Sequence, residues 1–338
     1  MQSTRTVQAV VLASVPEGVP VATDFTTTEQ ALPEVGPGQV RVAVRDLSLD
    51  PYIRSTLGGS HLGDAPVKPG GVVGGRAVGE VVESRSDSLA VGDLVVAETG
   101  WVSEAVVEAS AATKVDLPSG VPASAALGVL GMPGLTAYAA LERHVMPAAG
   151  ETVVVSSATG GVGALAGQLL AAAGARPVAI VGSREKAALA TQKLGYAAAV
   201  VRGSDTFADD LRAACPDKVN GYLHMGDQAT LDVVMEQLAV GARVSLIGVM
   251  DQSNGAPATR VRAGAVMAAR ATLMGMVIYD HFDLAAEHVA KVGALVAAGE
   301  IAAFEDRTVG LDQAGAAFAR MMSGANVGKA VVEVSRRV

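Results

Sequence analysis

Short apolar runs, separated by glycine and proline, follow one another through the first 120 residues of the chain. The runs are rich in valine, which favours strands over helices. They predict strands at 7–12, 39–44, 78–82, 93–98 and 101–107. Short strands in close succession are typical of an all-β barrel or a rolled sheet. We therefore expect the first part of the chain to form such a sheet.

The pattern changes near Val121, where helical spacing of apolar positions begins at 123–129 and 135–143. After these helices, apolar runs alternate with helical segments. The runs predict strands at 152–156, 177–181, 198–202, 219–224, 242–248 and 272–278, and the segments between and after them predict helices at 161–174, 184–194, 205–214, 228–239 and 283–299. This alternation predicts an α/β fold, with a doubly wound parallel sheet.

The end of the chain returns to strand-like sequence at 307–309 and 329–334, around a helix at 311–323. We expect this last segment to rejoin the first region. The sequence thus predicts two domains, one formed by 1–124 with 305–338 and the other by 125–304. Ligands commonly bind in clefts between domains, so a cleft between the two is the expected site.

A glycine motif marks the first turn of the predicted parallel sheet. Apolar residues 153–155 lead into Ala158-Thr-Gly160-Gly-Val-Gly163, and a helix follows. Gly160 allows close approach of a pyrophosphate, and Gly163 lets the helix pack tightly on its strand. The N–H groups at the start of the helix attract phosphate charge. The motif predicts a dinucleotide site, although Ala158 stands where the usual pattern has its first glycine.

The end of the second strand indicates which dinucleotide binds. A unit that prefers NAD usually ends this strand with an acidic residue for the ribose 2′-hydroxyl, but none stands at 181–183. The sequence instead runs Gly182-Ser183-Arg184-Glu185-Lys186. A hydroxyl and two cations suit a 2′-phosphate. We therefore expect NADPH as the cofactor.

Composition narrows the class of protein. The 338 residues are 50% hydrophobic, enough to fill two cores. A net charge of −8 and a pI near 5.2 argue against a surface for nucleic acid or anionic membranes. The chain has one cysteine, shows no secretory leader, and lacks an uninterrupted apolar stretch of membrane-spanning length. We expect a cytoplasmic protein.

Several short sequence motifs, separated along the chain, together resemble those of one family. They are Asp50-Pro51-Tyr52-Ile53-Arg54, Gly131 to Tyr138, Ala158 to Gly163, Met274 to Val277 and Asn326 to Lys329. The chain resembles the zinc-independent medium-chain dehydrogenase/reductases, in the branch of prostaglandin, leukotriene, double-bond and curcumin reductases. The resemblance implies a GroES-like β-barrel catalytic domain, a Rossmann NADP-binding domain and a homodimer. It also implies NADPH-dependent reduction of the carbon–carbon double bond of enones and enals.

By position, the resemblance implies a set of cofactor residues. The nicotinamide side would be lined by Met132, Gly134, Thr136 and Asn326. The pyrophosphate would be held by Ala158, Thr159, Gly160, Gly161, Val162 and Gly163, and the 2′-phosphate by Gly182, Ser183, Arg184 and Lys186. Met225 and Gly248 complete the set.

The chain departs from the family pattern at three places. Arg202 replaces a tyrosine after the third strand, and we expect its guanidinium to contact phosphate. His224-Met225 replaces an Asp-Asn pair, which leaves the nicotinamide contacts there open. Ser253 stands where an aromatic residue is common, and this change would reshape the substrate end.

Hydride transfer to a conjugated double bond needs a hydrogen-bond donor at the carbonyl oxygen, where charge develops. Tyr52 and Tyr279 are the candidate catalytic phenols. The alternative is that each ring only packs and wets its hydroxyl. Arg54 either orients an acidic substrate group or serves as a structural ion-pair partner.

No metal is expected, because zinc dehydrogenases of this architecture need cysteine and histidine ligands. The first 150 residues contain only His61 and His144 as candidate ligands of these types, and the single Cys215 is assigned to packing. Two other functions stay open: an NADPH quinone reductase and a non-catalytic NADPH-binding protein.

Overall fold

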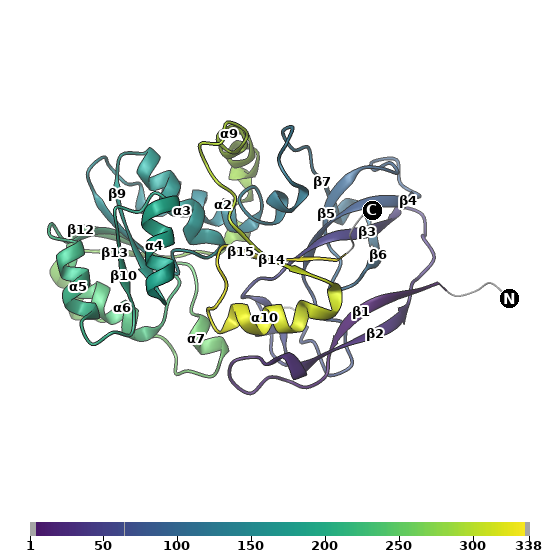
Figure 1. Ribbon diagram of the computed structural model, residues 1–338, viewed down its shortest axis with the longest axis horizontal. Coiled ribbons are helices and arrows are strands. Elements are labelled where there is room, and N and C mark those ends of the chain that lie inside the picture. Colours follow the sequence, from purple (N-terminus) through teal and green to yellow (C-terminus); the bar gives the residue numbers. More distant parts are fainter. Residues whose placement is uncertain (1–4, 64, 335–338) are drawn as a thin grey trace. The chain divides into compact units, whose positions relative to one another are not determined.

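The computed structural model describes residues 5–63 and 65–334, which form two compact units (Figure 1). One unit contains the chain up to Gly128 together with the segment from Glu305, and the other is Val129–Phe304. The first boundary lies after Gly128, whereas the sequence predicted it after residue 124. The reason is a short helix at 123–127 whose buried Ser124 donates a hydrogen bond to Glu305 of the same unit.

The first unit is built on strands. Its seven-stranded sheet has the order β14-β15-β3-β4-β5-β7, with β6 paired to β3, and β1 and β2 form a separate antiparallel pair. The strands are β1 (Thr6–Leu12), β2 (Phe25–Ala31), β3 (Gln39–Ser48), β4 (Arg76–Ser84), β5 (Leu94–Glu98), β6 (Glu104–Glu108), β7 (Thr113–Lys114), β14 (Glu305–Val309) and β15 (Lys329–Glu333). The sequence did not predict β2, since Phe25-Thr-Thr-Thr-Glu-Gln-Ala has little apolar content and is largely exposed.

Helices of the first unit are mostly single turns, and they are η1 (Ala22–Asp24), α1 (Ile53–Thr56), η2 (Ala109–Ala111), η3 (Ala123–Leu127), η6 (Leu311–Gln313) and α10 (Ala314–Met322). The longest, α10, packs on an aromatic cluster. The rings of Phe25, Trp101 and Phe318 lie 5.4 to 5.8 Å apart. A side chain at Gly315 would begin 2.6 Å from Phe25, so glycine permits this close packing.

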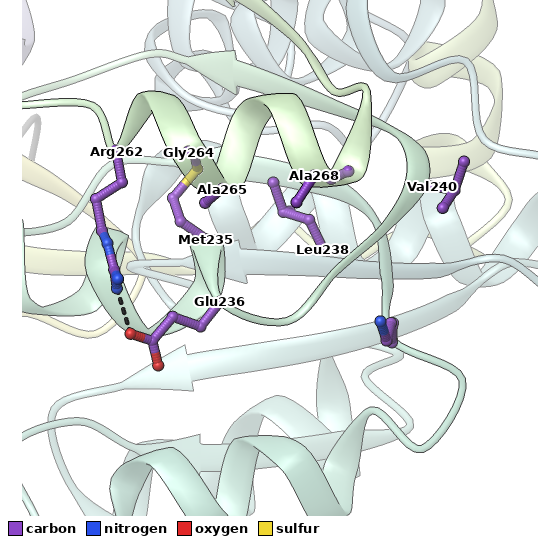
Figure 2. Close-up of a pocket in the computed structure, with 10 residues that line it drawn as sticks. Met235, Glu236, Leu238, Val240, Arg262, Gly264, Ala265 and Ala268 are labelled. Atoms are coloured by element: carbon purple, nitrogen blue, oxygen red, sulfur yellow. Dashed lines mark hydrogen bonds and ion pairs between the residues drawn. The ribbon is translucent and has the colours of Figure 1, made fainter.

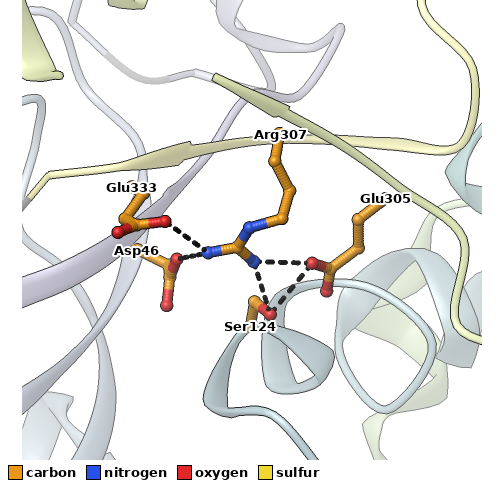
Figure 3. A network of polar contacts seen from close by, with 5 residues as sticks. All are labelled: Asp46, Ser124, Glu305, Arg307 and Glu333. Carbon is orange, nitrogen blue, oxygen red and sulfur yellow. Dashed lines mark hydrogen bonds and ion pairs between the residues drawn. The ribbon is translucent and has the colours of Figure 1, made fainter. Parts of the chain in front are cut away.

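The end of the chain rejoins the first unit, as the sequence predicts. Strand β15 pairs antiparallel with β3, and β14 pairs parallel with β15. Figure 3 shows the polar network that accompanies this return. Arg307 on β14 contacts Asp46 at 2.7 Å, Glu305 at 2.7 Å, Ser124 at 3.0 Å and Glu333 at 3.3 Å. One guanidinium therefore links β14 to β3, β15 and η3.

The second unit contains a six-stranded sheet of order β10-β9-β8-β11-β12-β13, with parallel pairing throughout. The strands are β8 (Thr152–Ser156), β9 (Arg176–Val181), β10 (Ala198–Val201), β11 (Val219–His224), β12 (Leu238–Leu246) and β13 (Thr272–Gly275). In chain order this is 3-2-1-4-5-6, the doubly wound arrangement of dinucleotide-binding folds. The predicted fold class is confirmed.

The helices of the second unit are α2 (Met132–Ala139), η4 (Ala140–Val145), α3 (Gly161–Ala172), α4 (Arg184–Lys193), α5 (Phe207–Ala214), α6 (Gln228–Met235), α7 (Met250–Ser253), α8 (Ala263–Ala269), η5 (Ile278–Leu284) and α9 (Ala285–Ala297). The helix predicted at 228–239 is wrong at its end. It stops at Met235, because β12 begins at Leu238 and pairs with Val219. The strand predicted at 272–278 likewise stops at Gly275, before η5. Across residues 5–63 and 65–334, none of the helices has the length and apolar character needed to cross a bilayer.

Candidate functional site

The candidate site lies at the carboxyl edge of the six-stranded sheet. Since the strands are parallel, their carboxyl ends meet at this edge, where open α/β sheets bind ligands. The segments that follow β8 to β12 carry most of the predicted cofactor residues: Ala158 to Gly163, Gly182 to Lys186, Arg202, Met225 and Gly248. The fold of this unit therefore brings segments from five strands to one edge.

The turn after β8 is closely packed. Gly160 is the N-cap of α3, and its carbonyl accepts the first helical hydrogen bond from Ala164, at 2.9 Å. A side chain on Gly163 would begin 2.6 Å from Ala158 Cα and 2.6 Å from the Ser157 carbonyl oxygen. No side chain fits there, so glycine is required. The N–H groups of 161–163, which precede the first helical bond, are the ones that a phosphate can use.

The alanine in place of the first glycine also has an explanation. The left-handed residue of this turn is Ser157, with a φ of 50°. Its hydroxyl donates to the Met225 carbonyl at 3.0 Å, which holds the conformation. Ala158 is fully buried, has a negative φ, and donates its N–H to Ile180 at 3.3 Å. Alanine therefore causes no backbone strain at this position.

Ser183, after β9, is the N-cap of α4. Its hydroxyl oxygen accepts from the Lys186 N–H at 3.3 Å. The pKa of Glu185 lies below its usual value, because its own N–H and the Ser183 hydroxyl both hydrogen-bond its carboxylate. Arg184 is exposed and Lys186 is half-buried. The cap thus presents a hydroxyl and two cations at the end of β9.

Arg202, after β10, is paired in this structure. Its guanidinium lies 2.9 Å from the carboxylate of Asp227, a residue that the sequence did not single out. Asp227 follows β11 and caps α6, where its other oxygen accepts from the Thr230 N–H at 2.8 Å. The ion pair therefore links the segments after β10 and β11.

His224, at the end of β11, is fully buried. Its Nδ1 lies 2.8 Å from the Tyr222 hydroxyl, and its Nε2 has no hydrogen-bond partner among the described residues. Burial lowers the pKa of His224 to about 4, against the opposing charges of Asp227 and Asp251. The imidazole is therefore neutral at pH 7. The next residue, Met225, donates its N–H to the Ser156 hydroxyl at 2.7 Å.

The predicted nicotinamide residues of α2, Met132, Gly134 and Thr136, lie within its first five residues. A side chain at Gly134 would begin 2.0 Å from the Val129 carbonyl oxygen, so this glycine is required for packing. The same carbonyl accepts a hydrogen bond from His288 Nε2 at 3.0 Å. The Thr136 hydroxyl donates to Met132 at 2.8 Å. Gly134 and Thr136 thus have local structural roles whether or not they contact a cofactor.

The two candidate phenols lie in different units. Tyr279, in η5 of the second unit, is 41% exposed, and its ring lies 5.7 Å from Phe282. Tyr52, in the first unit, precedes α1, and its ring lies 5.1 Å from His61. Asn326, also in the first unit, donates its amide N–H to Gly328 at 2.8 Å. The roles assigned to all three remain predictions.

Helix η5, which carries Tyr279, is anchored by contacts that the sequence did not reveal. Buried His144 contacts Ser245 at 2.9 Å, and its ring lies 5.5 Å from that of His281 in η5. Arg143 forms an ion pair with Asp283. Both anchoring residues come from the π-helix η4, a type of helix that is frequent near functional sites.

Two further expectations can be compared with the structure. Arg54 is buried and donates to the carbonyls of Pro16 and Gly18, both at 3.0 Å. Backbone carbonyls replace the expected ion-pair partner, and burial lowers its pKa despite the charge of Asp24. Cys215 is buried, and burial raises the pKa of its thiol to about 11, as expected of a packing residue.

Within residues 5–63 and 65–334, no cluster of three histidine, cysteine or acidic side chains could hold a metal. A pocket of ≈ 720 Å³ opens elsewhere on the second unit (Figure 2). It is lined by α8, by Lys218 just before β11, and by Leu238 and Val240 at the start of β12. These are the amino ends of the strands, so the pocket is separate from the candidate site.

The chain is similar to known oxidoreductases over nearly its whole length. Residues 8–115 match a family described as the N-terminal domain of oxidoreductase, and 161–297 match one described as zinc-binding dehydrogenase. It is 35% identical, over 96% of both chains, to the NADPH-dependent curcumin reductase of Escherichia coli (strain K12). It is 32% identical, over 97% of both, to the 2-alkenal reductase (NADP(+)-dependent) of Nicotiana tabacum. The structure of CurA from Vibrio vulnificus in complex with NADPH matches with a TM-score of 0.91 and 31% identity, covering 98% of this chain and 100% of that one.

Proposed function

The chain belongs to the zinc-independent medium-chain dehydrogenase/reductases, as its sequence phrases predicted, and from this membership we propose its function. It is an NADP-dependent oxidoreductase. Within that class, we propose that it reduces the carbon–carbon double bond of α,β-unsaturated ketones and aldehydes by hydride transfer to the β-carbon. The names of its relatives, a curcumin reductase and a 2-alkenal reductase, support this substrate class.

The observation that carries the cofactor part is the geometry after β8 and β9. Gly163 lets α3 pack against Ala158 and Ser157, and the N–H groups of 161–163 precede the first helical hydrogen bond, so they suit a pyrophosphate. Ser183, Arg184 and Lys186 then stand where an NAD-preferring site has a carboxylate. The residues present therefore fit NADPH.

The cofactor, when bound, supplies the hydride. The residues of this chain would bind it, orient the substrate and stabilise the negative charge that develops on the carbonyl oxygen. A tyrosine hydroxyl, from Tyr279 or Tyr52, would donate to that oxygen. Water would then protonate the carbon next to the carbonyl. We also propose that the protein acts as a cytoplasmic homodimer, which sedimentation of the purified protein would test.

Oxidation of NADPH against a panel of substrates tests the proposal. Linear enones and enals should be turned over, and the matching saturated ketones and aldehydes, as the control, should not. The product should be the saturated carbonyl compound. Turnover of simple quinones in preference to enones would favour a quinone reductase instead. Tight NADPH binding without oxidation by any member of the panel would favour a non-catalytic binding protein.

A further inference from the structure

We propose that Asp227 is a positioning residue for the cofactor, because it draws the guanidinium of Arg202 over the end of β9, where the 2′-phosphate binds. The inference rests on the proposed NADPH dependence and deepens it. It concerns binding alone, so it can fail while the reductase activity stands.

The sheet order carries the first step. Arg202 follows β10 and Asp227 follows β11, and the ends of β9 and β8 lie between these two strands. At about 4.8 Å per strand, the ends of β10 and β11 are roughly 14 Å apart. An ion pair of 2.9 Å between the two segments must therefore cross the sheet edge. The ends it crosses carry Ser183 and the Ala158–Gly163 turn.

The backbone of Arg202 is held beside the end of β9. Its N–H donates to the Val181 carbonyl, the last residue of β9, at 2.8 Å. Gly182 and Ser183 follow directly. The Arg202 side chain, in contrast, is 48% exposed and has many rotamers to choose from. The ion pair with Asp227 restricts Arg202 to rotamers that extend its guanidinium toward the segment after β11.

The contact leaves Arg202 able to bind phosphate. Only Nη1 pairs with Asp227, and a guanidinium has five N–H donors arranged to meet two oxygens at a time. Asp227 in turn uses one oxygen for Arg202 and the other for the cap of α6. Although burial opposes it, hydrogen bonds from Thr230 and the charge of Arg202 lower the pKa of Asp227. The carboxylate is thus ionised and fixed on both sides.

Two opposite effects can be separated by one substitution. If Asp227 only adds negative charge near the phosphate, its neutralisation should tighten binding. If it positions Arg202, neutralisation should weaken binding. Asp227→Asn suits the test, since asparagine caps helices as well as aspartate and α6 should keep its start.

The probes are adenosine 2′,5′-bisphosphate and adenosine 5′-monophosphate, which differ by the 2′-phosphate, titrated calorimetrically at fixed ionic strength. Arg202→Gln should weaken the bisphosphate about tenfold. Asp227→Asn should weaken it roughly three- to tenfold and leave the monophosphate within about twofold. In the Arg202→Gln background, Asp227→Asn should have no further effect.

Tighter or unchanged bisphosphate binding in Asp227→Asn would overturn the proposal, as would an equal loss for both probes or a loss that persists without Arg202. Asp227→Ser, which keeps a cap but is too short to reach Arg202, should repeat the result and guards against a folding defect. If Arg202→Gln leaves the bisphosphate unaffected, Arg202 does not contact the 2′-phosphate and the inference fails. Turnover of enones would decide the reductase function separately.

Discussion

The candidate phosphate half of the site, residues 152–186, is continuous in sequence, whereas the candidate substrate half, Tyr52 and Tyr279, comes from different units. In the candidate phosphate half, the turn after β8 depends on backbone, with a required glycine at 163 and a left-handed Ser157. The start of α4 adds the side chains of Ser183, Arg184 and Lys186. The candidate substrate half consists of side chains in or beside short helices. The pyrophosphate is common to every dinucleotide, whereas the 2′-phosphate and the substrate are not. We therefore expect local backbone geometry to recognise the pyrophosphate, and side chains, some of them in separate segments, to supply specificity.

The largest expected effect is in the substrate half. Tyr279→Phe should lower kcat more than it alters KM for the enone, because the donor acts on charge that develops in the transition state. The loss of transition-state stabilisation should reach at most roughly 2.7 to 4 kcal/mol. Tyr52→Phe is the matched comparison, and we expect the smaller loss there. Steady-state kinetics on both variants measures this. Full activity in the double variant would mean that neither phenol is the donor.

The phosphate half should break most readily at Gly163. Gly163→Ala places a carbon 2.6 Å from Ala158 Cα, so α3 must shift, at about 1 to 3 kcal/mol of stability and with weaker NADPH binding. Gly264→Ala is the control, because its new carbon meets no atom within 4 Å. Denaturant unfolding and NADPH titration of both variants check this. Equal behaviour of the two would contradict the required close approach.

A pH experiment shows whether His224 belongs to the interior. Its pKa is about 4 in the folded protein against 6.5 ordinarily, so between these values the unfolded chain binds the extra proton. The free energy of unfolding should therefore fall as pH falls through this range, by about 2 kcal/mol at pH 5 from this residue. His224→Gln should remove that part of the slope. An unchanged slope would show that His224 titrates normally.

Cofactor preference gives a smaller effect. Lys186→Ala should raise KM for NADPH roughly tenfold, because the variant loses a hydrogen bond to a charged group, which contributes about 1.5 kcal/mol of binding free energy. KM for NADH should change little, because NADH lacks the 2′-phosphate. Parallel kinetics with both cofactors measures the difference. Equal kinetics of the wild-type protein with NADPH and NADH would contradict the assignment.

Chelation is expected to have no effect. No cluster within residues 5–63 and 65–334 could hold a metal, so prolonged treatment with a chelator should leave turnover intact. Metal analysis before and after treatment is the control. Stoichiometric zinc, with activity lost on its removal and restored on its return, would contradict the prediction.

Sequence patterns determined the elements of the second unit well where breakers enclose an apolar run. Strands β8 and β11 have the predicted bounds, 152–156 and 219–224. The boundary between α6 and β12 was wrong, because Val233 to Val240 is apolar on both sides of Glu236 and Gln237 and has no glycine or proline to mark where the helix ends. Only pairing of Val219 with Leu238 decides that a strand begins there. Strand β2 was missed because its own sequence has no apolar run. It forms a strand by pairing antiparallel with β1.

The family, the parallel sheet and the tight glycine turn after β8 follow from the sequence alone, since they depend on residue types at short, fixed spacings. Partners remote along the chain were decided by tertiary structure. Asp227 as the partner of Arg202, backbone carbonyls as the partners of Arg54, and Tyr222 beside His224 in the interior are examples. The physical reason is that the chemistry of a polar side chain limits which groups it can bind. Burial and proximity, which depend on the whole fold, decide which of those groups it does bind.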